Sequence, residues 1–327
     1  MTRGLVLGKF LPPHAGHLFL VEFAQRMCTE LTVVVGTLRR EPIAGELRHR
    51  WMCELCPGAR VLHLTDENPQ HPEEHPDFWN IWRRSLLGLL EAPPDVVFAS
   101  EAYGARLAQE LGARFVMVDA GRVAVDVSGT RVREAPFAHW ELLPPCVRAH
   151  YALRVSVFGP ESTGKTTLAR RLADHYRTRW VPEFARTHLL QRDGALRAED
   201  LPHIARGQRA SEDALARAAR QLLFCDTDPL ATEIWSDVMF QAVDPEVTRL
   251  AQSSHYDLTL LLDADVPWVA DPVRYLPHQG REFFERCRHA LEGAGRRTTL
   301  VHGDFEARFE AACRAVDELI EERGVVQ

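Results

Sequence analysis

The stretch GPESTGKT at residues 159–166 carries the residue types and spacing that most directly predict chemistry. It fits G-x-x-x-x-G-K-[ST], a loop whose glycines let backbone N–H groups surround phosphate oxygens. Lys165 can then reach the β- and γ-phosphates of ATP, and the Thr166 hydroxyl can ligate Mg²⁺. Apolar spacing on either side predicts a strand over 153–158 and a helix over 167–176, the context that this loop needs. The predicted ATP-binding residues of the loop are Gly159, Glu161, Ser162, Thr163, Gly164, Lys165, Thr166 and Thr167.

Acidic residues end or follow two further strand-like runs in the same half of the chain. LLFCD ends in Asp226, a Walker B arrangement that presents a carboxylate to Mg²⁺ or its water shell. Asp228 and Thr232 are secondary candidates. In RWVPEFAR, Glu183 and Arg186 should project at the carboxyl end of a strand, where α/β sheets bind ligands. We expect Glu183 to bind or deprotonate an acceptor hydroxyl, with an ion pair at a helix start as the alternative.

The polar, proline-bearing segment 263–280 resembles the lid of a kinase. Arg274 and Arg281 could close over the transferring phosphate and exclude water, so Arg274 joins the predicted ATP-binding residues. The alternative is that both arginines are simply solvated.

The N-terminal half carries a second phosphate motif, G-x-F-x-P-x-H-x-G-H, across residues 8–17. It resembles the HxGH signature of the nucleotidylyltransferases, a Rossmann-like superfamily. His14 and His17 would stand at a helix N-terminus and donate hydrogen bonds to ATP phosphates, and Gly16 would allow close approach of the backbone. Catalysis would then rest on positioning and on stabilising charge at the α-phosphate. The predicted ATP-binding residues here are Gly8, Lys9, Phe10, His14 and His17.

VSGTRVR at residues 127–133 resembles the [IV]-S-x-T-x-x-R element that closes the same fold. Ser128 and Thr130 can cap a short helix and offer donors, while Arg133 can hold the β- and γ-phosphates. All three are predicted to bind ATP, and Arg133 is also a predicted catalytic residue. A capped surface helix with a solvated arginine is the alternative.

An acceptor-selecting segment is expected over residues 68–87, where a proline-rich loop precedes a helix. Trp79 and Trp82 lie three apart on one face of that helix, and flat aromatic rings suit stacking on a nicotinamide ring. Ordinary core packing of both tryptophans is the alternative.

Alternating strand and helix patterns place these motifs on two doubly wound parallel sheets, an α/β fold class. In the first half, strands are expected over 4–8, 32–36, 60–64, 95–100 and 114–118, with helices near 17–27, 46–56, 77–91 and 102–111. In the second half, a long helix over 201–221, a strand over 298–302 and a final helix over 305–322 are expected. Pro144-Pro145 interrupts the periodicity, so we expect a transferase domain over 1–150 and a P-loop kinase domain over 151–327.

The composition is that of an ordinary globular protein, with 327 residues and a net charge of −7. This charge argues against broad nucleic-acid binding. No apolar run approaches the length of a membrane span or a signal peptide, and the seven cysteines are scattered, so a cytoplasmic location is expected. Only two of the 39 basic residues are lysines, Lys9 and Lys165, and each lies in one of the two phosphate motifs.

The order of these motifs resembles the NadR-type bifunctional enzymes of NAD synthesis. The matching stretches are GKFLPPHAGH, DFWNIW, FASEAYG, VSGTRVREAPFAHW, GPESTGKTTLARRLA, VPEFAR, FCDTD and DVPWVADPVR, which together run through nearly the whole chain. The resemblance implies a kinase that phosphorylates nicotinamide riboside to nicotinamide mononucleotide (NMN), and an adenylyltransferase that converts NMN to NAD. It implies ATP and Mg²⁺ as cofactors and no membrane partner, and it leaves a homo-oligomer open. It also implies that Trp268 or Tyr275 stacks on the nicotinamide.

Two departures from the family are expected to matter. Some members begin with a helix-turn-helix repressor domain, whereas this sequence starts at the first strand of the transferase, so neither DNA binding nor repression is expected. Pro272 stands where the family's lid usually has glycine, which would affect lid flexibility and kinase rate. The alternatives to the two-step enzyme are a nucleotide-sensing regulator with weak catalysis and an adenylyltransferase–kinase fusion of another cofactor pathway.

Overall fold

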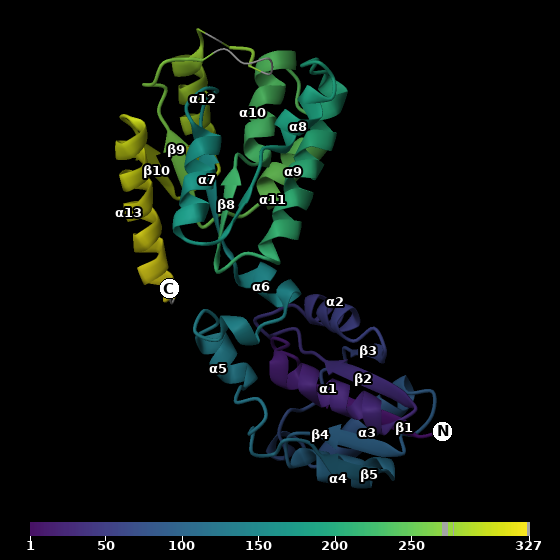
Figure 1. Ribbon diagram of the computed structural model, residues 1–327. Helices are drawn as coiled ribbons and strands as arrows, with labels where there is room; N and C mark the ends of the chain where they lie inside the picture. The colour runs from purple at the N-terminus through teal and green to yellow at the C-terminus, as the bar shows by residue number, and fades with distance from the viewer. Residues whose placement is uncertain (270–273, 277, 326–327) are drawn as a thin grey trace. The chain divides into compact units, whose positions relative to one another are not determined.

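The computed structural model describes residues 1–269, 274–276 and 278–325, so the expectation at Pro272 lies outside the described residues. The chain divides into two compact units, Met1–Val147 and Arg148–Gln327, at a point inside α6 (Pro145–Tyr151). Each unit holds a five-stranded parallel sheet with helices on both sides (Figure 1). The predicted fold class, two doubly wound parallel sheets, is confirmed.

The first sheet has the strand order β3-β2-β1-β4-β5. Its strands are β1 Arg3–Gly8, β2 Glu30–Gly36, β3 Arg60–Leu64, β4 Val96–Ala99 and β5 Arg114–Met117. The helices of this unit are α1 Ala15–Met27, α2 Gly45–Leu55, α3 Phe78–Leu89, α4 Tyr103–Leu111 and α5 Gly129–Glu134, with short 3₁₀ turns at Pro72–Glu74 and Trp140–Leu142.

Alternation along the strands explains why this sheet is covered on both faces. Val6 of β1 packs in one core cluster with Leu20 of α1 and Met52 of α2. Its neighbour Leu5 packs in another cluster with Leu86 of α3. Apolar runs such as ELTVVVG therefore form strands that are buried from both sides.

The second sheet has the order β10-β9-β6-β8-β7. Its strands are β6 Leu153–Phe158, β7 Arg179–Val181, β8 Leu222–Asp226, β9 Leu258–Leu262 and β10 Thr298–Val301. The helices are α7 Lys165–His175, α8 Phe184–Leu190, α9 Leu201–Ala216, α10 Pro229–Phe240, α11 Pro245–Ser253, α12 Gly280–Gly293 and α13 Phe305–Arg323, with a 3₁₀ turn at Ala198–Asp200.

Two local expectations differ from the structure. The helix expected over 201–221 ends at Ala216, because the chain must turn into β8 and does so through Gln221, which has a left-handed φ of 68°. The segment 229–253, for which no helix was predicted, forms α10 and α11, each opened by an aspartate and a proline.

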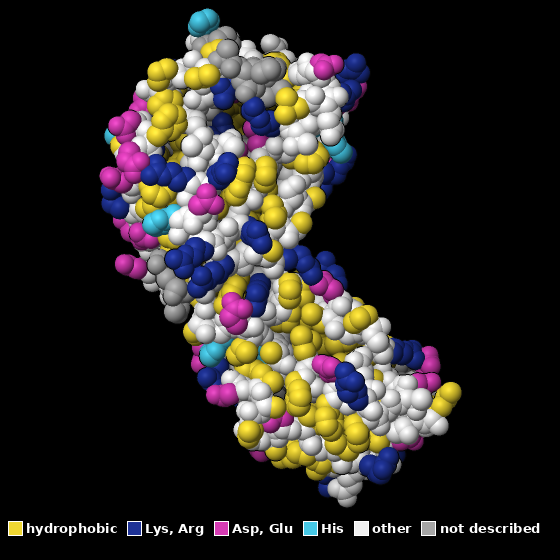
Figure 2. Space-filling view, in the orientation of Figure 1, with side chains coloured by type: hydrophobic (Ala, Val, Ile, Leu, Met, Phe, Trp, Pro, Cys, Tyr) yellow, Lys and Arg dark blue, Asp and Glu magenta, His cyan; other side chains and the backbone are white. Residues whose placement is uncertain are grey.

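The face shown in Figure 2 carries acidic and basic side chains interspersed rather than gathered by sign. No helix in the described part of the chain has both the length and the apolar character needed to cross a membrane.

Candidate active sites

Each unit has a pocket lined by the residues that the sequence motifs predict. The first unit holds a pocket of about 660 Å³ around the loop between β1 and α1. The second holds a pocket of about 160 Å³ beside the loop between β6 and α7. Both loops follow the carboxyl end of a central parallel strand, which is where open α/β sheets bind ligands.

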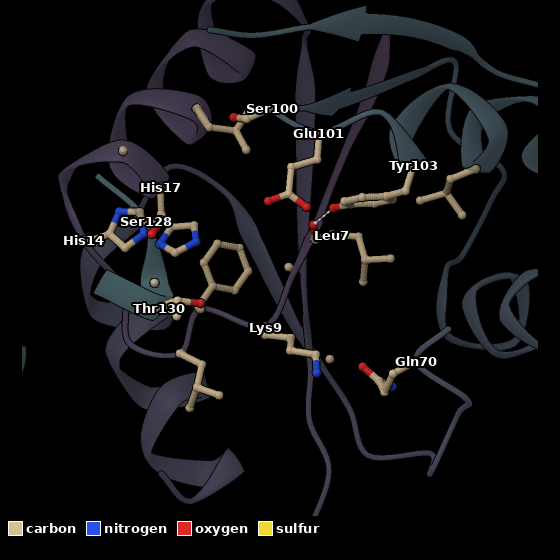
Figure 3. A pocket seen from close by; sticks show the side chains of 18 of the residues that line it. Leu7, Lys9, His14, His17, Gln70, Ser100, Glu101, Tyr103, Ser128 and Thr130 are labelled. Atoms are coloured by element: carbon tan, nitrogen blue, oxygen red, sulfur yellow. Dashed lines mark hydrogen bonds between the residues drawn. The ribbon is translucent and has the colours of Figure 1, made fainter. Parts of the chain in front are cut away.

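The two motif histidines lie together on one wall of the larger pocket (Figure 3). His14 occupies the N-cap position of α1, and His17 follows in its first turn. Their ring centroids are 3.7 Å apart, with 31° between the ring planes. A Cβ on Gly16 would lie 3.2 Å from the His14 ring, so the glycine between them makes this close pair fit. The predicted pairing of the imidazoles at a helix start is therefore present.

Burial keeps both imidazoles neutral near neutral pH. Burial, with a smaller effect from Arg122, lowers the pKa of His14 from 6.5 to about 4. Burial, followed by the neighbouring His14 and by Arg122, holds the pKa of His17 well below its usual range. Neither Nδ1 atom has a hydrogen-bond partner among the described residues. Two neutral N–H donors of this kind can bind phosphate oxygens, but they bring no positive charge.

The short helix α5 is connected to the histidine loop by Arg133. Ser128 caps α5 by accepting a hydrogen bond from the backbone N–H of Arg131 at 3.3 Å. The Arg133 guanidinium donates to the Leu11 carbonyl at 2.6 Å and to the Thr130 hydroxyl at 3.1 Å. Arg133 thus joins two motifs separated by 122 residues and also lines the pocket. Its predicted contact with phosphates stays a prediction.

Gly8, Lys9 and Phe10 shape the floor of the pocket, which all three line. Phe10 is buried and has a left-handed φ of 46°, and its ring lies 3.0 Å from where a Cβ on Gly8 would stand. The Lys9 side chain is half exposed, and its ammonium lies 3.1 Å from a carboxylate oxygen of Glu41.

Trp79 and Trp82 lie between the larger pocket and the core of the first unit. Both line the larger pocket, and both also pack against the hydrophobic core beneath α3. The indole N–H of Trp82 donates to the Pro69 carbonyl at 2.8 Å, which fixes the ring relative to the proline-rich loop. Their role in stacking on a nicotinamide stays a prediction.

Sequence reasoning missed several residues of this pocket, among them Gln70, Glu101, Tyr103 and Arg122. Figure 3 shows the Glu101 carboxylate pointing into the cavity. The Tyr103 hydroxyl donates to the Leu7 carbonyl at 2.7 Å, close to the end of β1. The stretch FASEAYG begins with the last two residues of β4 and continues past the carboxyl end of the strand. This position at the carboxyl edge of the sheet was the signal that could have found Glu101 and Tyr103.

The glycine loop of the second unit adopts its shape through three residues with left-handed φ. These are Gly159 at 136°, Ser162 at 65° and Gly164 at 86°. A Cβ on Gly159 would lie 2.7 Å from the Leu262 carbonyl oxygen, so only glycine fits there. The Lys165 ammonium donates to the Pro160 carbonyl at 2.8 Å and lines the pocket with Thr166 and Thr167.

The predicted Mg²⁺ ligands lie side by side. The Thr166 hydroxyl donates to a carboxylate oxygen of Asp226 at 2.5 Å, and the other oxygen of this buried carboxylate has no partner among the described residues. Burial, with Glu183 as the next cause, raises the pKa of Asp226 to about 7. An oxygen pair with an unsatisfied buried carboxylate fits a hard divalent cation that takes its remaining ligands from phosphates and water. The described residues contain no group of three or more His, Cys, Asp and Glu side chains arranged to hold a metal.

Glu183 and Arg186, the predicted acceptor-binding residues, line the second pocket together with residues of α9. Glu183 stands at the N-cap position of α8. The Gln208 side chain, which the sequence did not single out, accepts the Phe184 N–H at 3.0 Å and donates to the Thr227 carbonyl at 3.4 Å. Gln208 therefore ties the start of α8 to the end of β8, and so fixes where Glu183 stands.

Two predicted ATP-binding side chains of the loop, Glu161 and Ser162, also hold the segment expected to be the lid. The Glu161 carboxylate accepts the backbone N–H groups of Tyr275 and Leu276 at 3.0 to 3.1 Å. The Ser162 hydroxyl accepts the Val269 N–H at 2.7 Å and a guanidinium N–H of Arg274 at 3.3 Å. These described residues of the segment are thus docked on the glycine loop.

Of the two aromatics left open, Tyr275 lines the pocket and Trp268 is not among the described lining residues. The Tyr275 hydroxyl donates to the Gly194 carbonyl at 2.6 Å, and its ring lies 6.4 Å from that of Trp235, another lining residue that was missed. Thr163 is buried, and its hydroxyl donates to the Pro160 carbonyl at 2.9 Å.

Of the remaining candidate residues in the second unit, one lines the pocket and two do not. Thr232 lines the pocket. Asp228 is buried outside it, capping α10 and accepting from the Ser156 hydroxyl at 2.7 Å. Arg281 lies in the first turn of α12 and pairs with Asp263 at 2.9 Å, and it is not a described lining residue.

These two sheets and their loops define a two-domain α/β protein with a nucleotidyltransferase-type pocket and a P-loop kinase-type pocket. A family model described as an AAA domain matches residues 154–308. The chain is 28% identical over 346 aligned residues to the "Trifunctional NAD biosynthesis/regulator protein NadR" of Escherichia coli strain K12, covering 98% of this chain and 84% of that protein.

Solved NadR structures share the fold over the whole chain. The crystal structure of a NadR protein in complex with NR has a TM-score of 0.81 at 22% identity, covering 100% of this chain and 97% of that one. A NadR complex with NAD and AMP-PNP has a TM-score of 0.76 at 22% identity and the same coverage. The chain is therefore similar to NadR in sequence over 98% of its length, and it shares the fold of the solved NadR structures.

Proposed function

We propose that the chain catalyses two consecutive reactions of NAD synthesis. The second unit would transfer phosphate from ATP to the ribose 5′-hydroxyl of nicotinamide riboside and so make NMN. The first unit would transfer AMP from a second ATP to NMN, giving NAD and pyrophosphate. The observation that carries this proposal is the presence of both nucleotide loops in one chain whose likeness to NadR spans 98% of its length.

In the kinase reaction, the riboside O5′ forms a bond to the γ-phosphorus while the bond from that phosphorus to the β–γ bridging oxygen breaks. ADP leaves with the bridging oxygen, and the hydroxyl proton passes to Glu183, which faces the pocket. Lys165 and Arg274, which line the same pocket, stabilise the charge on the transferring group. Thr166 and Asp226 would hold a Mg²⁺ ion, which neutralises phosphate charge when bound.

In the adenylyl transfer, a phosphate oxygen of NMN attacks the α-phosphorus of ATP, and the bond to the α–β bridging oxygen breaks to release pyrophosphate. No covalent intermediate with the protein is needed. The neutral His14 and His17 donate N–H groups, while positive charge for the phosphates comes from Lys9, Arg122 and Arg133 on the same pocket. The pocket of about 660 Å³ is of the size that accommodates a bound cofactor.

The cellular setting is part of the proposal. The seven cysteines have no disulfide partners, as in a reducing compartment, and this supports a cytoplasmic location. No DNA partner is proposed for the residues described.

One coupled assay tests the function. The protein is incubated with ATP, Mg²⁺ and nicotinamide riboside, and NMN and NAD are followed together. Pantetheine phosphate and dephospho-coenzyme A are offered in parallel as alternative acceptors. We expect NMN to form and be converted to NAD; turnover of only the two coenzyme A precursors would refute the proposal.

A further inference from the structure

The largest fully buried side chains in the described part of the molecule are two arginines, Arg48 and Arg308. Their exposed fractions are 0% and 1%. Arginine is almost never fully buried unless its charge and its donors are satisfied. One lies in each unit, and neither is among the residues that line the two pockets described above.

Arg48 lies on α2 behind the histidine loop. Its guanidinium donates to the Lys9 carbonyl at 2.6 Å, to the Ile43 carbonyl at 3.1 Å and to the Glu41 carboxylate at 2.5 Å. Glu41 also accepts the Leu38 N–H at 2.9 Å and pairs with the Lys9 ammonium. Both the backbone and the side chain of Lys9 are therefore fixed from behind the pocket.

Arg308 lies on α13 behind the glycine loop. Its guanidinium donates to the Thr163 carbonyl at 2.7 Å, to the Gly303 carbonyl at 2.8 Å and to the Asp263 carbonyl at 3.0 Å. It also pairs with the carboxylate of Asp265. This one side chain joins the P-loop, the end of β9, the start of the lid segment and the turn before α13.

In each loop, the carbonyl that accepts the arginine hydrogen bond belongs to a residue that is next in sequence to one with a left-handed φ. Lys9 precedes Phe10, whose φ is 46°, and Thr163 stands between Ser162 at 65° and Gly164 at 86°. Such positions cost on the order of 1–3 kcal/mol each for a residue other than glycine, and they persist only where the surroundings fix them. A planar guanidinium can donate in several fixed directions at once, which an ammonium on a flexible chain cannot do.

We propose that Arg48 and Arg308 are positioning residues, each of which sets the backbone path of one ATP-binding loop without touching ATP. The proposal rests on the two-step function above. It places the same device, a buried arginine bonded to a loop carbonyl and to one carboxylate, behind two loops of unrelated sequence. Without the arginine, the backbone of each loop should shift away from the conformation that its phosphate contacts require.

The test uses Arg48→Lys and Arg308→Lys in the full chain, with each variant serving as the matched control for the other. Kinase turnover is measured as NMN formed from nicotinamide riboside, and transferase turnover as NAD formed from added NMN. We expect Arg308→Lys to lower kinase kcat/KM for ATP about a hundredfold, since a misplacement of about 1 Å can have that effect. Transferase activity should stay within about twofold because the sites are separate. Arg48→Lys should lower transferase kcat/KM for ATP about a hundredfold and leave kinase activity within about twofold.

The split between kcat and KM separates positioning from mere loss of folded protein. A smaller folded fraction lowers apparent kcat and leaves KM for ATP unchanged, whereas a displaced loop raises KM for ATP. The idea is overturned if both activities fall together, if KM for ATP is unchanged, or if neither activity changes.

If a lysine variant fails to fold, Asp265→Asn and Glu41→Gln test the same arrangement with the arginine in place. A neutral partner makes a weaker hydrogen bond than a carboxylate, so KM for ATP should rise about tenfold in the corresponding reaction. An unchanged KM in these variants would overturn the proposal. Failure of the function itself is distinct, because the wild-type protein would then lack one of the two turnovers.

Discussion

Acidification should destabilise the first unit through its buried histidines. His14 has a pKa of about 4 in the folded chain and 6.5 as its ordinary value, so as pH falls the unfolded chain takes up a proton before the folded chain does. The stability that His14 provides is complete above its unfolded pKa and is lost as pH falls from about 6.5 toward 4. Between about pH 7 and about pH 5, linkage gives a loss of about 2 kcal/mol for this group. His17, whose pKa is also lowered, acts in the same direction.

The assay compares wild type with His14→Asn, since asparagine suits an N-cap and does not titrate in this range. Urea unfolding is followed by hydrogen exchange in peptides from residues 1–147, and the His14 ring is titrated by NMR. The wild-type free energy of unfolding should fall more steeply with acid than that of the variant, by about 2 kcal/mol over this window. Equal slopes, or a His14 pKa near 6.5, would refute the reasoning.

Further predictions concern the two loops. Lys165→Ala should lower kinase turnover about 10³-fold and leave adenylyl transfer unchanged, whereas His17→Ala should lower adenylyl transfer and leave kinase turnover unchanged. Measuring the rates of both reactions in each variant checks this prediction. A folded variant that lacks both activities would contradict the two-site assignment. Gly159→Ala should destabilise the second unit by more than about 2 kcal/mol, because a left-handed residue costs 1–2 kcal/mol even without the clash against Leu262. Gly295 has a φ of 61° and open space around it, so Gly295→Ala should lose only the stability that a left-handed φ costs alanine. Equal melting temperatures for the two variants would show that the clash at position 159 is relieved.

The sequence was sufficient where chemistry depends on short motifs. The glycine loop before Lys165 and the position of His14 and His17 at a helix start were predicted from spacing alone, because loop, helix start and strand end are neighbours along the chain. The alternation of strands and helices likewise predicted both sheets. The contact of Glu161 with the segment 263–280 could not be predicted, since its carboxylate accepts backbone N–H groups more than 100 residues further along the chain.

The supporting residues could not be found in this way. Arg308 bonds to Thr163 across 145 residues, and Arg48 bonds to Lys9 across 39. In a chain so rich in arginine, neither residue differs by sequence from the solvated ones. Burial separates them, and burial follows from tertiary packing. Gln208 is similar, because its two partners come from separate elements.

The scarcity of lysine has a practical consequence for labelling. Primary amines in this chain are confined to the N-terminus, Lys9 and Lys165, and each lysine side chain borders one of the two pockets. A reagent that acylates amines therefore acts as a site-directed probe without any engineering. Peptide mass spectrometry of the labelled chain would report the occupancy of both nucleotide sites at once, one lysine for each.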